Sequence, residues 1–117
     1  MKILKWNIYR ANLDPVIGSE QGKSRPVLVI SEDDINALLN IVNIIPLTSR
    51  KKNRIIYPNE VLISADFGLE NDSIVLCHQI RTIDKKRLSK LYGKLSSPSL
   101  QEEVIEALSF QLGINKK

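Results

Sequence analysis

Cysteine is nearly absent from this chain of 117 residues, because Cys77 is the only one. A single cysteine excludes an internal disulfide and every zinc site that needs several thiolates. No apolar stretch approaches the roughly 20 residues that cross a bilayer, and charges interrupt the N-terminal segment too early for a signal peptide. A chain of this length buries enough surface to fold without disulfides or metal. We therefore expect one domain over residues 1–117, in a reducing cytoplasm and not at a membrane.

Aromatic residues are also few, namely three tyrosines, two phenylalanines and one tryptophan. Adaptor domains that bind proline-rich peptides need a groove lined with aromatic rings, so this composition argues against an adaptor. The same scarcity limits the stacking of nucleic-acid bases on side chains. No cluster of metal-ligand side chains has convincing spacing, and we expect neither a metal nor another cofactor.

Positive charge is in modest excess, with 17 Lys and Arg against 13 Asp and Glu and a formal net charge of +4. This excess alone does not indicate nucleic-acid binding. Its distribution is uneven, because "RKKNR" at residues 50–54 holds four cations whereas residues 97–113 hold three glutamates and no cation. The cationic run is either a solvated loop or a phosphate-binding site, and its position in the fold must decide.

The apolar pattern predicts a mostly β domain with short helical insertions. We expect a helix at residues 31–40 capped by Ser31, and a helical turn at 85–90 capped by Asp84. Strands are expected at residues 6–13, 25–31, 41–48, 60–64, 73–83 and 91–95, with a turn at 66–72.

The C-terminal segment is the clearest helix in the chain. Ser99 and Glu102 would form its capping box, and Gly113 would end it. Its apolar residues recur every four positions, at Leu100, Val104, Leu108 and Leu112. Together these elements predict a small curved antiparallel sheet or barrel that carries a C-terminal amphipathic helix.

Two long loops carry polar residues where they meet the predicted strands. Residues 14–24 lead into Arg25, and residues 50–58 follow Thr48. Long loops on a rigid sheet are common positions for functional sites. Each residue also has a purely structural alternative: Arg25 could form a surface ion pair with Glu20, and threonine simply favours strands.

Four segments are spread along residues 12–114, namely "NLDPVIGSEQGKSRPVLVIS", "NIIPLTSR", "GLENDSIVLCHQIRTIDKKRLSKLYGKL" and the helix ending in "EALSFQLGI". In their order and spacing they resemble the MazF/PemK toxins of bacterial toxin–antitoxin pairs. The resemblance implies an SH3-like barrel of the MazF/PemK/CcdB type, a homodimer, and a ribonuclease that cuts single-stranded RNA at a short sequence without metal. It also implies a cognate, MazE-like antitoxin that silences the site.

The chain departs from the family's pattern in two places. Lys5-Trp6-Asn7 stands where the family usually has Arg-Gly-Asp or Arg-Gly-Glu, and His78 stands where relatives commonly carry a carboxylate. The first departure affects the first turn of the chain and not the site. The second predicts a different sequence preference.

Cutting RNA without a metal uses the neighbouring 2′-hydroxyl as nucleophile. The protein must help remove its proton, protonate the leaving 5′-oxygen and stabilise negative charge on phosphorus. A guanidinium offers a planar fork of donors to phosphate oxygens, and the resemblance assigns Arg25 of the "RP" motif to this catalytic position. Thr48 would donate its hydroxyl to the same phosphate. The proton carrier stays open, and Arg25 is the candidate that the resemblance implies.

Polar residues of both loops are expected to hold the RNA strand, with cations on phosphates and with amides and carboxylates on the edges of unstacked bases. Ile17 could support a base, although packing under its loop is the favoured interpretation. The predicted RNA-binding residues are Ile17, Ser19, Glu20, Gln21, Lys23, Ser49, Arg50, Lys51, Lys52, His78 and Gln79.

Alternation along the predicted strand 73–83 sets His78 on the apolar face, while Gln79 points the other way. We therefore expect His78 to contact a base or to pack, and not to act as the general base. Gln79 is expected to read a base.

Two other functions stay open. A CcdB-type toxin shares the fold but poisons DNA gyrase by binding it, and a non-catalytic SH3-like module would only bind a partner. The resemblance favours a metal-independent, sequence-selective endoribonuclease toxin. Such a toxin would act as a homodimer on single-stranded messenger RNA in the cytoplasm and thereby inhibit translation and growth.

Overall fold

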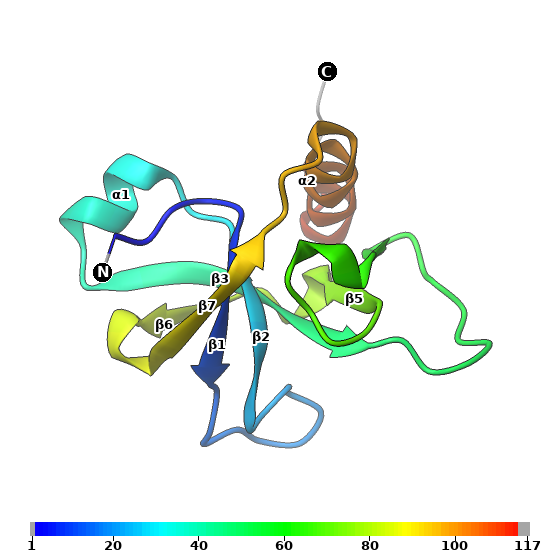
Figure 1. Cartoon of the computed structure of the whole chain (residues 1–117), viewed down its shortest axis with the longest axis horizontal. Helices are drawn as coiled ribbons and strands as arrows, with labels where there is room; N and C mark the ends of the chain where they lie inside the picture. Colours follow the sequence, from blue (N-terminus) through cyan, green and yellow to red (C-terminus); the bar gives the residue numbers. More distant parts are fainter. Residues whose placement is uncertain (1, 115–117) are drawn as a thin grey trace.

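A seven-stranded antiparallel sheet forms the framework of the computed structural model, which describes residues 2–114 (Figure 1). The strands are β1 (Asn7–Asn12), β2 (Ser24–Val29), β3 (Ile41–Ser49), β4 (Glu60–Ile63), β5 (Ser73–Leu76), β6 (Arg81–Asp84) and β7 (Leu88–Lys94). The helices of this part of the chain are α1 (Asp33–Leu38), α2 (Pro98–Leu112) and the short 3-10 segments η1 (Ala65–Phe67), η2 (Cys77–Gln79) and η3 (Lys85–Arg87). The expected β fold with a C-terminal helix is confirmed.

The long strand β3 joins two halves of the sheet. Neighbouring strands follow the order β4-β5-β3-β2-β1-β7, and β6 pairs with the first half of β3. β3 pairs with β2 up to Pro46 and with β5 from Leu47 onward. This change of partner curves the sheet, and Figure 1 shows β4, β5 and α2 set to one side of β1 and β2.

Alternating residues of the strands face two apolar clusters. On β2, Val27 and Val29 pack in the cluster with Tyr9, whereas Leu28 packs in the cluster that also contains Val104 of α2. Period-two alternation explains this division, since successive side chains of a strand point to opposite faces. Each fully buried aliphatic side chain contributes about 1.5–3 kcal/mol relative to an exposed one. The two clusters therefore fix the register of β2 and, with it, the position of the residue at its start.

The caps predicted for the two helices are wrong. α1 begins at Asp33 after Glu32, because the hydroxyl of Ser31 is buried and bonds to Asn36 and to the backbone N–H of Asn43 instead. α2 begins two residues earlier than its predicted capping box.

The start of α2 follows from a proline. Pro98 occupies the first turn, where its missing N–H does no harm, and Ser97 accepts a bond from the N–H of Leu100 at 3.3 Å. Gly113 ends the helix with a φ of 69°, as predicted. Asp84 also caps η3 as predicted, although β7 already begins at Leu88.

None of the helices within residues 2–114 is long and apolar enough to cross a membrane.

Candidate functional site

β2 and β3 separate at the end of their shared ladder, and Arg25 and Thr48 lie on either side of the split. Val27 and Pro46 form the last pair of this ladder, after which β3 pairs with β5. Continuing the register by two residues would set Arg25 opposite Thr48. Both residues are half-buried. The two predicted catalytic residues therefore lie just beyond the last β2–β3 pair, one on each strand.

The guanidinium of Arg25 is held at its inner nitrogen and open at its outer ones. Nε donates to the carbonyl oxygen of Gly22 at 2.9 Å. In the described part of the chain this is the only hydrogen bond of the Arg25 side chain, so both terminal nitrogens can donate to a ligand. Glu20 forms no ion pair with it and instead accepts from the N–H of Ile17 at 3.0 Å. The structural alternative for Arg25, a surface ion pair with Glu20, is wrong.

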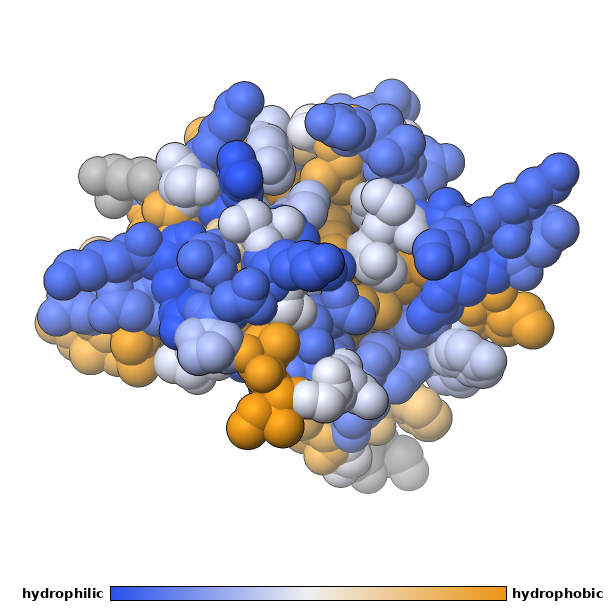
Figure 2. Space-filling view, turned by 90° about the horizontal axis from the view of Figure 1, so that it is seen from below, coloured by the Kyte–Doolittle hydropathy of each residue, from blue (hydrophilic) through white to orange (hydrophobic). Residues whose placement is uncertain are grey.

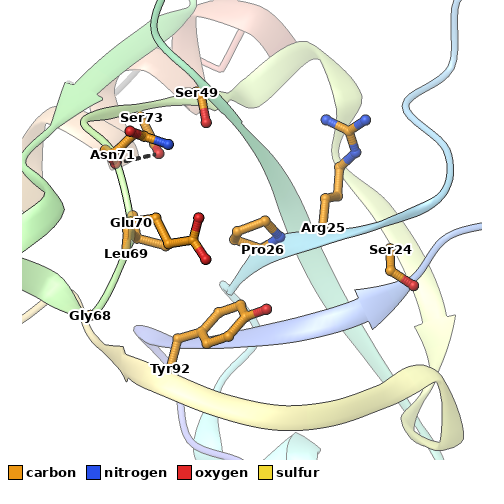
Figure 3. A pocket seen from close by; sticks show the side chains of 10 residues that line it. All are labelled: Ser24, Arg25, Pro26, Ser49, Gly68, Leu69, Glu70, Asn71, Ser73 and Tyr92. Atoms are coloured by element: carbon orange, nitrogen blue, oxygen red, sulfur yellow. Dashed lines mark hydrogen bonds between the residues drawn. The ribbon is translucent and has the colours of Figure 1, made fainter.

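A cavity of about 210 Å³ opens beside Arg25 (Figure 3). One wall comes from β2 and β3, and the other from the segment after η1 together with β7. The lining residues are Ser24, Arg25, Pro26, Ser49, Gly68, Leu69, Glu70, Asn71, Ser73 and Tyr92. Among these, Glu70, Asn71 and Tyr92 were not predicted, because "GLEND" is typical of a turn and "LYGKL" of an ordinary strand.

A second cavity, of about 270 Å³, adjoins the first at Ser49. Thr48 lines it, and predicted RNA-binding residues from three segments meet there. Its lining residues are Gln21, Thr48, Ser49, Lys51, Arg54, Leu76 and His78. The fold thus brings parts of both predicted loops and the end of β5 to one place.

His78 does not lie on an apolar strand face, and that prediction is wrong. The segment predicted as one strand is interrupted after Leu76, whose φ and ψ of −93° and 79° lead into η2. This break ends the alternation, so Cys77 is buried and His78 is exposed. His78 therefore shares a cavity with Thr48.

Gln79 binds the first loop. Its Oε1 accepts from the backbone N–H of Gln21 at 3.2 Å, and its Nε2 donates to the carbonyl oxygen of Ser19 at 3.2 Å. Arg81 supports the start of the same loop by donating to the carbonyl oxygen of Leu13 at 3.2 Å. The base contact predicted for Gln79 stays a prediction, whereas its role in holding the loop is visible.

Ile17 projects from the first loop into solvent. Its side chain is 83% exposed, the largest value among the exposed large hydrophobic residues of the described chain. The favoured interpretation, packing under the loop, is therefore wrong. Ser19, Glu20 and Lys23 of the same loop are also exposed.

The cationic loop is anchored from within. Arg54 donates from two nitrogens to the carboxylate of Glu60, at 2.9 and 2.8 Å, and the Glu60 side chain is only 2% exposed. The hydrogen bond from Arg54 is the main cause that lowers the pKa of Glu60, and the same bond raises the pKa of Arg54. Arg50, Lys51 and Lys52 remain exposed. The loop is thus a fixed segment that presents three cations.

An open groove with aromatic side chains adjoins the second cavity. His78 and Arg54 also line this groove of about 490 Å³, together with Tyr57 and Phe110. Tyr57 and Phe110 are largely exposed. The sequence did not predict Tyr57 or Phe110 as site residues. No local pattern indicates that Phe110, near the end of α2, lies close to the cationic loop.

Residues that commonly ligate metals are scattered in this fold. Over residues 2–114, no group of three or more His, Cys, Asp or Glu side chains lies close enough to hold a metal ion. Burial raises the pKa of the Cys77 thiol to about 12, so the thiol stays protonated at neutral pH.

Comparison with known proteins identifies the family. Residues 4–112 match the protein family described as "PemK-like, MazF-like toxin of type II toxin-antitoxin system". The chain belongs to this family. A relative in Bacillus subtilis (strain 168), named Endoribonuclease EndoA, is 38% identical over 115 residues, which are 97% of either chain. The resemblance seen in the sequence is confirmed.

Solved structures of the MazF-like family share the fold. MazF from Deinococcus radiodurans is 29% identical, with a TM-score of 0.82 over 97% of this chain and 98% of that one. A MazE-MazF structure from the same organism is also 29% identical, with a TM-score of 0.74 over 98% and 99% of the two chains. The SH3-like barrel expected of a MazF/PemK toxin is therefore confirmed.

Proposed function

We propose that this toxin is a metal-independent, sequence-selective endoribonuclease that cuts single-stranded RNA, including messenger RNA in the cytoplasm. The observation that carries the proposal is the open guanidinium of Arg25, whose outer nitrogens have no partner among the described residues. Arg25 lines a cavity that adjoins, at Ser49, the cavity lined by Thr48. The 38% identical relative from Bacillus subtilis is named an endoribonuclease. The chemistry assigned to Arg25 fits this activity.

Cleavage proceeds by an internal transfer at phosphorus. The 2′-oxygen loses its proton and forms a bond to phosphorus, while the bond from phosphorus to the 5′-oxygen breaks and that oxygen takes up a proton. The products are a 2′,3′-cyclic phosphate and a 5′-hydroxyl, so this step consumes neither an oxidant nor water. Charge accumulates on the non-bridging oxygens, where Arg25 and the hydroxyl of Thr48 donate hydrogen bonds. The guanidinium of Arg25 is charged at the start and at the end of the step. The proton passes from the 2′-oxygen to the 5′-oxygen, and the group that carries it stays open, with Arg25 the candidate that the resemblance implies.

The strand of RNA would run across both cavities. Lys51 and Arg50 supply charge for phosphates at one side, and Lys23 does so from the first loop. Gln21 and His78 are placed beside Thr48, where they can contact the edge of an unstacked base. The exposed Ile17 offers an apolar surface to a base, and Ser19, Glu20, Ser49 and Lys52 offer polar ones.

An antitoxin is the proposed protein partner. The family's description names type II toxin–antitoxin pairs, and a 29% identical relative is a MazE-MazF structure. A MazE-like partner with an acidic segment would be attracted to Arg50, Lys51 and Lys52. Figure 2 shows the face of the protein on which the first loop lies. This face is mostly hydrophilic, with apolar patches between the hydrophilic areas.

A homodimer is the proposed assembly. Besides those on the two loops and at Leu91, exposed large hydrophobic side chains gather at two places within residues 2–114, and such surfaces commonly mark contacts between proteins. One place is α1 and the start of β3, with Ile35, Leu38, Leu39 and Ile41; the other is the end of α2, with Phe110, Leu112 and Ile114. Light scattering of the purified protein would give the mass of the assembly, and a monomer at micromolar concentration would contradict the proposal.

The experiment that tests the activity is incubation of the purified toxin with a long defined RNA in excess EDTA, followed by mapping of the cut ends. We expect cuts at one short sequence with cyclic-phosphate and 5′-hydroxyl ends. Intact RNA together with tight binding to DNA gyrase would favour the CcdB-type alternative. Intact RNA that is cut only after a divalent ion is added would contradict the metal-independent mechanism.

A further inference from the structure

We propose that the cavity lined by Glu70, Asn71 and Tyr92 binds one nucleobase next to the phosphate held by Arg25, and that Glu70 selects guanine there. The inference rests on the proposed ribonuclease function, because it names a substrate subsite of the same opening. It adds a specificity-determining residue that lies outside both predicted loops.

The position of the cavity points to a nucleotide beside the cut. Arg25 lines it, Thr48 lines the adjoining cavity, and Ser49 lines both. A phosphate bound between Arg25 and Thr48 would leave its two attached nucleosides on opposite sides of Ser49. One base would then enter the cavity of Glu70 and the other the cavity of His78.

The size of the cavity fits a single base. Its volume of about 210 Å³ equals the space of about seven water molecules in the liquid. Pockets for drug-sized ligands begin at about 300 Å³, so this one is suited to a fragment with one ring system. A whole nucleotide with its sugar and phosphate would not be enclosed.

The charge of the cavity favours a base over a phosphate. Figure 3 shows the Glu70 carboxylate directed toward Pro26 and the Tyr92 hydroxyl extending below Pro26 toward β2. The Arg25 guanidinium lies on the far side and is turned away from Glu70. Among the described residues, no cation forms an ion pair with Glu70, so its charge would repel a phosphate. The ring of Tyr92 carries Lys90 Nζ at 5.9 Å from its centroid and supplies an aromatic surface within the cavity. Aromatic surfaces beside carboxylates and amides are typical of sites for unstacked bases.

The carboxylate of Glu70 favours guanine among the four bases. An ionised carboxylate only accepts hydrogen bonds. Guanine presents two neighbouring N–H donors on its Watson–Crick edge and can bind both oxygens. Adenine and cytosine present one amino group beside an acceptor nitrogen, and uracil presents one N–H between two carbonyl oxygens that the carboxylate repels. The expected order is therefore guanine first and uracil last.

The segment that carries Glu70 is fixed before RNA arrives. A Cβ atom at Gly68 would lie 2.1 Å from the carbonyl oxygen of Tyr92, so the backbone at Gly68 rests directly on β7. Asp72 accepts from the N–H of Ala65 at 3.0 Å and, through its carbonyl, from the N–H of Arg50 at 2.9 Å. These contacts preorganise the cavity, and preorganised groups discriminate between ligands without a cost in loop ordering.

The test is the cleavage of an RNA library with randomised positions around the cut, compared between the wild type and Glu70→Gln. For the wild type we expect guanine to be favoured over uracil by roughly ten- to a hundredfold at one position adjacent to the cut. Glu70→Gln, whose amide both donates and accepts, should reduce this preference to within a few-fold and leave the other positions unchanged. Tyr92→Leu should weaken cleavage of the preferred RNA while Tyr92→Phe should retain most of it. Glu103→Gln, which changes an exposed carboxylate on α2, is the matched control.

The outcomes separate this inference from the proposed function. If the wild type cuts RNA and Glu70→Gln keeps the same preference at every position, the guanine subsite is wrong while the ribonuclease stands. A uniform loss of rate over all sequences in Glu70→Gln would also overturn the subsite, because Glu70 would then act on the chemistry itself. If the wild type cuts no RNA, the proposed function and the subsite fall together.

Discussion

Gln79 and Gln21 are joined across the opening by a hydrogen bond of 3.2 Å from the backbone N–H of Gln21 to the side-chain oxygen of Gln79. The amide nitrogen of Gln79 donates to the carbonyl oxygen of Ser19, also at 3.2 Å. One side chain after β5 therefore binds the backbone of the first loop at two points. Gln79 is thus one of the contacts that hold the first loop in position, together with Arg81 and Arg87 at the start of the loop.

Replacing Gln79 should loosen this loop without unfolding the protein. Gln79→Ala removes two hydrogen bonds that contribute about 0.5–1.5 kcal/mol each, so we expect cleavage to fall roughly ten- to a hundredfold. Faster hydrogen exchange at the N–H of Gln21 should accompany the loss. Gln111→Ala, at an exposed glutamine that bonds to Asn59, is the control. Lost cleavage with unchanged exchange at Gln21 would show that Gln79 contacts RNA directly.

Replacing Arg25 should remove most of the activity. Arg25→Ala should reduce the rate of cleavage about 100-fold or more, because the charge that develops on phosphate loses its main donor. Arg25→Lys should recover little of this loss, since an ammonium cannot form the planar two-bond contact. Thr48→Ala should impair turnover by about tenfold. Single-turnover rates on one defined RNA measure these effects.

The matched control for Arg25 is Arg10→Ala, which removes the same charge from an exposed position on β1. Its rate should stay within a few-fold of the wild type. A folded Arg25→Ala protein with full activity would refute the assignment of the site.

The buried Glu60 should make the stability of the protein depend on pH. Its hydrogen bonds from Arg54 lower its pKa in the folded state, so the stabilisation is complete above the ordinary pKa of a glutamate. It is lost as the pH falls through the lowered folded value, because the carboxylate is then protonated in both states. Glu60→Gln should reduce the free energy of unfolding by about 2–3 kcal/mol at neutral pH. This loss is smaller than that for breaking a fully buried ion pair, because the Arg54 side chain is 31% exposed.

Urea denaturation of the wild type and Glu60→Gln over a range of acidic pH would measure this difference. The two curves should converge as the medium becomes acidic. Asp34→Asn, at an exposed position of α1, should show no such convergence. A constant difference at every pH would mean that packing, and not charge, accounts for the role of Glu60.

His78 should influence which sequence is cut. Because the side chain is exposed, His78→Ala should remain folded. We expect it to keep a large part of the cleavage rate and to change the preference at one position. Profiles of rate against pH for both proteins on the same RNA provide the check. Abolished cleavage together with the disappearance of a titration near neutral pH would identify the histidine as the general base instead.

The three exposed cations of the second loop should attract the antitoxin. Lys51→Ala/Lys52→Ala should lower the affinity for the cognate antitoxin roughly tenfold at low salt, with a smaller effect at high salt. Lys86→Ala/Lys94→Ala removes the same charge from exposed positions elsewhere and serves as the control. Calorimetric titrations at several salt concentrations measure both variants. Equal losses in the two variants would mean that the attraction depends only on net charge.

Sequence patterns predicted most of the strands, and Arg25 at the start of one of them, because these depend on local signals. The apolar alternation around Val27 and the "RP" junction are legible within a few residues. The exposure of His78 was not predictable in this way, since it depends on a backbone break at Leu76 within an apolar run that is typical of a continuous strand. The approach of Glu70 and Tyr92 to Arg25 depends on tertiary packing, which no local pattern encodes.

The close backbone contact between Gly68 and β7 has a consequence for how such a toxin diversifies. The segment that carries Glu70 and Asn71 is fastened to β7, whereas Arg25 is fastened to β1 and the core beneath β2. Substitutions at Glu70 or Asn71 therefore leave the reactive arginine in place, provided that two glycines are kept. These are Gly68 and its neighbour Gly93 on β7, where a Cβ atom would lie 2.1 Å from the carbonyl oxygen of Phe67. A lineage of such proteins could acquire new target sequences through these few positions while its cutting chemistry stays unchanged.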